Sequence, residues 1–173
     1  MWLLATLGLT TLPFVSVGLA GEKVEQRGGV VAEPASASEQ AVVGVDPGCL
    51  GALALLDDGH LTDVVDMPVV CVRRGKSDKR QIEPYELAAL LRRWAPGVVV
   101  IEQVGGMPGQ AAGASFNFGR AAGAPEYIAA ALGIRTALVH PATWKKRLGV
   151  RGDKDNSRYA AMKLLPAHAD KLK

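Results

Sequence analysis

Two acidic residues, Asp46 and Glu102, each follow a short apolar run, at 41–45 and 98–101. Such runs are typical of buried strands in a parallel sheet. Because ligand sites in these sheets lie at the carboxyl ends of the strands, the two carboxylates would meet at one edge if their strands are neighbours. Paired carboxylates without histidine or cysteine favour Mg²⁺, with Mn²⁺ as a second choice. The alternative is that either acid only caps its strand.

A pair of such ions about 4 Å apart can activate water and stabilise the leaving oxygen of a phosphodiester. The position of both acids at strand ends therefore favours a functional role, such as metal-dependent phosphodiester hydrolysis, over two strand caps.

The elements that must position these acids alternate between apolar strands and amphipathic helices. The pattern predicts strands at 41–46, 51–56, 61–67, 98–102 and 134–139, with a hairpin turn at 57–60 that makes the first three an antiparallel meander. It predicts helices from Pro84, from Ser115 as a cap to about 132, from Pro141, and at 154–165. Residues 73–80 are expected to form a polar loop. The fold class is thus α/β, with a mixed five-stranded sheet and flanking helices.

The chain is 173 residues long, 49% hydrophobic, and carries a formal net charge of +3. One compact domain fits this length, and wholesale disorder does not fit this composition. Residues 1–40 hold two basic residues against four glutamates, so the positive charge belongs to 41–173, where it could attract phosphates. Two cysteines make no disulfide framework, and we expect a cytoplasmic protein.

The first 21 residues carry no charged side chain, and 22–40 are rich in Glu, Ala, Ser and Gly. We expect 1–40 to be an apolar extension followed by a flexible linker, with the domain at 41–173. A misplaced start is the favoured explanation of the apolar run. A secretion signal or membrane anchor stays open, although no basic residue precedes the run and Pro13 interrupts it.

The ordered set of segments resembles the RuvC-like Holliday junction resolvases, in their phage and bacterial branch. GVDPGCLGALAL and VVVIEQVGGMPGQ are similar to the first two motifs, and SFNFGRAAG, HPATWKKRLG and GDKDNSRYAAMKLLP to the later ones. The resemblance covers about residues 41–170. It implies a ribonuclease H-like fold and a magnesium-dependent endonuclease that resolves four-way DNA junctions in recombination and repair, as a homodimer without a small-molecule cofactor.

The resemblance also implies roles for individual residues. Asp46 and Glu102 would be metal-binding catalytic carboxylates, and Lys145 and Lys154 catalytic lysines beside the scissile phosphate. Phe116 could touch a base, although a place in the core is the alternative. The remaining DNA-binding residues would be basic side chains whose alternative is plain solvation: Arg73, Arg74, Lys76, Lys79, Arg80, Lys146 and Arg158.

The family completes its metal site with one or two aspartates on a final helix, and the sequence ends at Lys173, where the preceding basic stretch would begin. We therefore expect an incomplete carboxylate cluster that binds metal weakly. Two rival hypotheses stay open. One is a catalytically inactive protein that binds DNA junctions. The other is an ATP-binding domain of the actin and sugar-kinase type, which the second acidic strand and the lysine-rich helices fit poorly.

Overall fold

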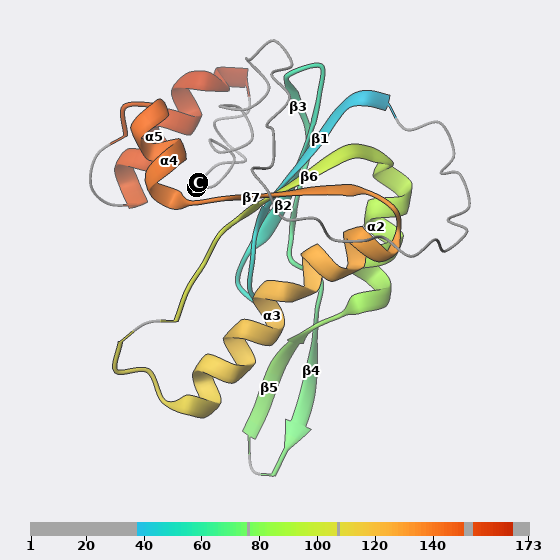
Figure 1. Cartoon of the computed structure of the whole chain (residues 1–173), viewed down its shortest axis with the longest axis vertical. Coiled ribbons are helices and arrows are strands. Elements are labelled where there is room, and N and C mark those ends of the chain that lie inside the picture. Colours follow the sequence, from blue (N-terminus) through green and yellow to red (C-terminus); the bar gives the residue numbers. More distant parts are fainter. Residues whose placement is uncertain (1–37, 76, 107, 151–153, 168–173) are drawn as a thin grey trace, which may run out of the picture.

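The computed structural model describes residues 38–75, 77–106, 108–150 and 154–167, without the side chains of 38–40, 74, 77, 154 and 155. Five strands form the main sheet in the order β3-β2-β1-β6-β7. Their bounds are β1 Ser38–Asp46, β2 Ala52–Asp57, β3 His60–Asp66, β6 Pro96–Glu102 and β7 Arg135–Val139. The predicted mixed sheet with flanking helices is confirmed (Figure 1).

The first three strands form the predicted antiparallel meander, since β1 pairs with β2 and β2 with β3 in opposite directions. The turn between β2 and β3 is formed by Asp58 and Gly59, both with positive φ, of 47° and 75°. This is the backbone that a two-residue hairpin turn requires. β1 then pairs with β6 in parallel, and β6 with β7, so β1 and β6 occupy the centre of the sheet.

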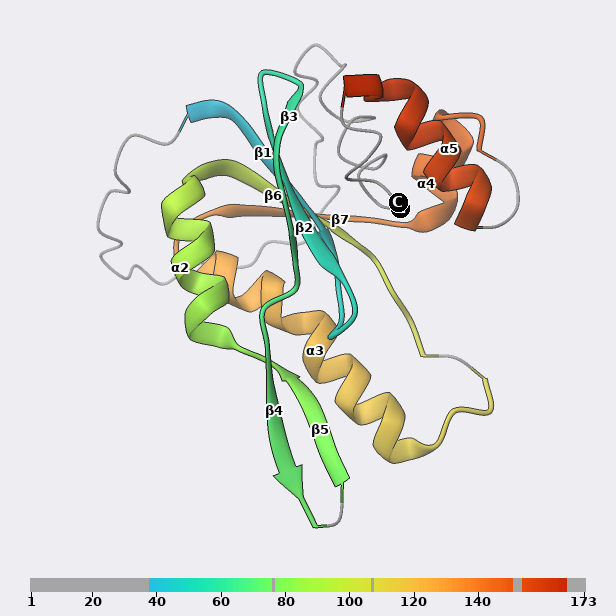
Figure 2. The ribbon, with the colours of Figure 1, turned by 180° about the vertical axis from the view of Figure 1, so that it is seen from behind.

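Helices cover both faces of the sheet (Figures 1 and 2). They are α2 Pro84–Trp94, α3 Ala112–Ala131, α4 Pro141–Arg147 and α5 Lys154–Leu164. The predicted start of α2 at Pro84 is confirmed. The predicted cap of α3 is wrong, because α3 begins three residues before Ser115, whose hydroxyl donates instead to the side chain of Gln110 at 3.2 Å.

Successive side chains of the central strands point alternately to the two faces of the sheet. On one face the main hydrophobic core joins Val43, Val45, Val99 and Ile101 to α2 and to Ala129 of α3. On the other face, Ala54, Leu56 and Leu61 pack with Leu165, which follows α5, and Val139 packs against the cluster of Trp144, Val150 and Ala161. We call these the α2/α3 face and the α4/α5 face.

The segment predicted as a polar loop at 73–80 is instead part of a β-hairpin. β4 (Val69–Arg74) and β5 (Ser77–Ile82) pair in an antiparallel two-stranded sheet that projects from the domain beside α3 (Figure 1). Apolar packing anchors its base, because Val69 and Ile82 pack against the main core. The rest of β5 is polar, so the period-two apolar pattern of a strand is missing from the sequence.

Of the N-terminal extension and linker predicted at 1–40, the structure describes only residues 38–40. β1 begins at Ser38, three residues before the domain start expected at 41. Residues 1–37, with the apolar run and most of the linker, lie outside the description. Within the described residues, none of the helices combines the length and the apolar character that crossing a membrane requires.

A tight turn fixes the end of β1 against the start of β2. The Gly51 N–H donates to the Gly48 carbonyl at 3.0 Å, and the Gly51 carbonyl accepts from Met67 N–H at 2.9 Å. A Cβ at position 51 would overlap the carbonyl oxygen of Asp46. A side chain there must displace the backbone that carries Asp46.

We therefore predict that Gly51→Ala lowers the free energy of unfolding by about 1–3 kcal/mol or more, the range typical of overpacking. Gly113→Ala on α3 is the matched control, because a Cβ there meets nothing within 4 Å and alanine favours a helix. Chemical denaturation measures both variants. Equal stability of the wild type and Gly51→Ala would show that the turn tolerates a side chain.

Candidate active site

The two carboxylates occupy the carboxyl ends of the two central strands. The parallel pairing of β1 and β6 runs to Val45 opposite Ile101, and Asp46 and Glu102 are the next residues of the two strands. Adjacent strands lie about 4.7–4.9 Å apart. The sheet therefore brings Asp46 and Glu102 side by side at one edge, as the apolar runs before them predicted, and both are half-buried.

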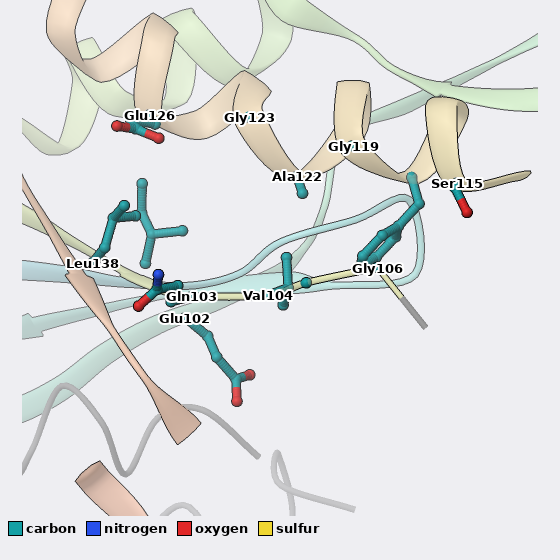
Figure 3. Close-up of a pocket in the computed structure, with 13 residues that line it drawn as sticks. Glu102, Gln103, Val104, Gly106, Ser115, Gly119, Ala122, Gly123, Glu126 and Leu138 are labelled. Carbon is teal, nitrogen blue, oxygen red and sulfur yellow. The ribbon is translucent and has the colours of Figure 1, made fainter. Parts of the chain in front are cut away.

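Both acids belong to the α4/α5 face. Side chains alternate along a strand, so Asp46 shares a face with Gly44, whose partner Ala54 packs toward Leu165. Glu102 pairs with Val139, which packs against the α4/α5 cluster. In Figure 3 the side chain of Glu102 accordingly extends away from α3, while Glu126 comes from α3 itself. The acid pair thus opens toward α4 and α5.

A third carboxylate lies in the same row of the sheet. Asp66, the last residue of β3, pairs with Ala52, and Ala52 pairs with Asp46. Two strand spacings separate the backbone of Asp66 from that of Asp46, about 10 Å, and the described residues include no group of three His, Cys, Asp or Glu that could hold a metal ion. The sequence analysis did not single out Asp66, although its strand also ends in an acid.

The donor set of the acid pair fits a hard cation. It offers carboxylate oxygens alone, and within the described part of the chain no three His, Cys, Asp or Glu residues form a metal-binding group. Mg²⁺ is commonly held by one or two carboxylates together with substrate phosphates and water. A closed structural zinc site, in contrast, takes four protein ligands, usually Cys and His.

Lys145 lies on the short helix α4, which follows β7 on the face of the acid pair. His140 caps this helix by accepting a hydrogen bond from Ala142 N–H at 3.2 Å. The Lys145 ammonium lies 5.5 Å from the centroid of the Trp144 ring, and Trp144 is 2% exposed. Lys145 is thus half-buried beside Trp144, whereas Lys146 and Arg158 of α5 are exposed.

The basic residues of the hairpin are exposed where they are described. Arg73, Lys79 and Arg80 are exposed, and Arg73 forms a long ion pair of 3.9 Å with Asp78. Exposed pairs of this kind contribute little stability, so they leave the arginine available to a phosphate. Lys76 and the side chains of Arg74 and Lys154 lie outside the description, and their roles stay predictions.

The two phenylalanines of α3, Phe116 and Phe118, differ in exposure. Phe116 is 67% exposed. Phe118 is half-buried, and a Cβ at Gly48 would lie 3.7 Å from its ring. Of the pair, Phe116 is therefore the one that could stack on a base.

A cavity of about 230 Å³ lies between the end of β6 and α3 (Figure 3). Gln103, Gly106, Gly119 and Gly123 are among its lining residues. Gly123 leaves room for the neighbouring Tyr127 ring, which a Cβ would meet at 2.9 Å. Glu102 also lines this cavity, but its side chain extends away from α3 (Figure 3).

Comparison with solved structures shows the fold. The chain is 18% identical to Thermus thermophilus RuvC in its complex with Holliday junction substrate, covers 79% of that chain with 73% of its own length, and gives a TM-score of 0.52. A second T. thermophilus RuvC structure matches at 18% identity, 73% and 80% coverage, and a TM-score of 0.46. The match with the TM-score of 0.52 confirms the ribonuclease H-like fold. Neither a family model nor a curated protein matches the sequence.

The two cysteines provide a test of the local environment next to the site. Burial raises the pKa of the Cys49 thiol above its ordinary value, and the charge of Arg80 offsets this in part. Cys71 on β4 is exposed.

We predict that N-ethylmaleimide modifies Cys49 more slowly than Cys71 at pH 8, because the raised pKa leaves less thiolate and burial limits access. Peptide mapping by mass spectrometry at timed intervals measures both rates in one sample. Cys49 reacting as fast as Cys71 would contradict the partly buried turn after β1.

Proposed function

We propose that the chain is a structure-selective, magnesium-dependent endonuclease that resolves four-way DNA junctions in recombination and repair. The observation that carries the proposal is the placement of Asp46 and Glu102 side by side at the ends of β1 and β6, on one face of the sheet. The fold shared with RuvC supports it, and that protein has been solved with Holliday junction substrate. Membership of the phage and bacterial RuvC-like branch is part of the proposal and rests on the sequence motifs.

Asp46 and Glu102 would hold the divalent ion, Mg²⁺ or Mn²⁺, through their carboxylate oxygens. When bound, the ion supplies charge stabilisation at the phosphate and a lower pKa for a bound water. The two half-buried carboxylates provide fixed negative charge on adjacent backbone segments, so their separation is set by the sheet and not by flexible loops. This is the pre-organisation that a phosphodiester site requires.

Lysines and arginines on both sides of the acid pair would bind the DNA backbone. Lys145 and Lys154 would stabilise charge at the scissile phosphate, as catalytic residues. Phe116 would stack on a base, since it is exposed on α3. The phosphate contacts would come from the exposed basic residues and from those outside the description: Arg73, Arg74, Lys76, Lys79, Arg80, Lys146 and Arg158.

Two symmetric nicks in a junction need two active sites, and a two-fold dimer matches a two-fold substrate. We therefore propose a homodimer.

The decisive experiment incubates the purified chain with a synthetic four-way junction and Mg²⁺ and maps the products on a denaturing gel. We predict paired nicks, and a loss of about 10³-fold in rate in Asp46→Asn and Glu102→Gln, since losing several kcal/mol of charge stabilisation has this effect. Asp57→Asn is the matched control, because Asp57 lies at the opposite end of β2. If Asp46→Asn cuts the junction at the same rate as the wild type, the metal-site proposal is refuted. Single unpaired nicks would refute the dimer.

The same experiment distinguishes the proposed endonuclease from the alternative, a catalytically inactive protein that binds DNA junctions. That alternative predicts salt-sensitive binding of the junction without nicks at any Mg²⁺ or Mn²⁺ concentration. Binding is followed by fluorescence anisotropy in Ca²⁺, so that cleavage cannot obscure it.

For Lys145 we predict that Lys145→Gln lowers the cleavage rate by about 10²-fold, the loss typical of one electrostatic group at a transition state. The control is Lys163→Gln on α5, whose ammonium packs on the Tyr159 ring at 4.7 Å. Single-turnover rates with saturating protein separate cleavage from binding. Equal cleavage rates for Lys145→Gln and Lys163→Gln would show that Lys145 has no catalytic role.

A further inference from the structure

A groove lies at the same end of the sheet as the acid pair but on the side of α3. It has a volume of about 170 Å³ and lies between the hairpin, α3 and the turn that follows β1. Its polar lining is formed by Arg80, Gln81, Asn117 and Arg120, with Cys49 contributed by the turn. We call it the arginine groove.

The two arginines come from different elements and line the same groove. Arg80 lies on β5, and Arg120 lies on α3 with Asn117, Ala121 and Ala124, the i, i+3, i+4, i+7 face of that helix. A hydrogen bond from the Cys49 thiol to the Arg80 carbonyl, at 3.5 Å, ties the hairpin to the turn after β1. Because three separate elements converge here, the groove is a feature of the folded domain.

The charge in the arginine groove is positive and unbalanced. The groove has no carboxylate among its described lining residues. Neither Arg80 nor Arg120 forms an ion pair with any residue that the structure describes. Guanidinium groups present a planar fork of donors that matches phosphate oxygens, and the Asn117 amide can add a donor. The ligand that this chemistry selects is a phosphate group.

The position of the arginine groove indicates where that phosphate comes from. Cys49 lies three residues after Asp46, so the groove and the acid pair share one turn of backbone, one on each side of the sheet edge. A DNA strand that crosses this edge would contact both. We propose that the arginine groove binds one non-scissile backbone phosphate of the DNA strand held at the acid pair, with Arg80 and Arg120 contacting the same phosphate. This inference rests on the proposed function.

The test measures binding of a fluorescein-labelled four-way junction by anisotropy in Ca²⁺, at several KCl concentrations. Arg80→Gln and Arg120→Gln should each weaken binding about ten-fold. Since both contact one phosphate, which counts once in the slope of log affinity against log salt, each single variant should keep most of that slope, and the double variant should lower it by about 0.9. Arg93→Gln, an exposed arginine in the last turn of α2, is the matched control. Thermal melting establishes that all variants are folded.

A second readout uses the thiol that lines the groove. The bound junction should slow N-ethylmaleimide modification of Cys49 more than that of Cys71, which is not among the lining residues. Affinities of Arg80→Gln and Arg120→Gln equal to that of Arg93→Gln, with no loss of slope in the double variant, overturn the inference. Protection of Cys49 by inorganic phosphate but not by DNA also overturns it, because it indicates a small-anion site. Absence of junction binding by the wild type overturns both the groove and the proposed function.

Cleavage is not a readout of this test, so the two proposals can fail separately. Junction binding with the expected slopes and no nicks supports the arginine groove and refutes the endonuclease. Paired nicks with unchanged affinity and slope in the double arginine variant refute the groove alone.

Discussion

The parallel pairing of β1 with β6 is the constraint on which the site depends. A shift of one residue in this register would move one acid to the α2/α3 face, because side chains alternate along a strand. The register is held by the packing on the α2/α3 face, where Val43, Val45, Val99 and Ile101 are buried in the main core. The hydrophobic contacts of one face thus determine where the charged groups of the other face lie.

Much of this arrangement could be predicted because the central strands are almost purely apolar. Their runs mark buried strands, and the acid that ends each run stands out as the residue that burial alone does not explain. The hairpin could not be predicted in the same way. Residues 77–81 are polar, and β5 is stabilised by its backbone pairing with β4 and by the apolar packing of Val69 and Ile82 at the base.

The missed hairpin also concealed Arg120. The i, i+3, i+4, i+7 face of Asn117, Arg120, Ala121 and Ala124 is visible in the sequence, but it is weakly apolar, and nothing in the sequence says which element it faces. Only the presence of β5 opposite this face gives Arg120 a neighbouring arginine. Asp66 was overlooked for a related reason, since the predicted strand at 61–67 ran through it to Met67 and did not end at the acid.

Two carboxylates on neighbouring strands repel each other, and like charges side by side in a sheet are destabilising. A fold that places them there accepts this cost at the edge of the sheet, where the acids are only half-buried and can meet solvent or a cation. A cation that binds the folded state alone would return the lost stability by linkage. Basic side chains occupy both flanks, with Lys145 on α4 and the arginines of the hairpin and α3 across the edge. The edge therefore combines negative charge at its centre with positive charge on both sides, a distribution that would suit the phosphate backbone of the proposed substrate.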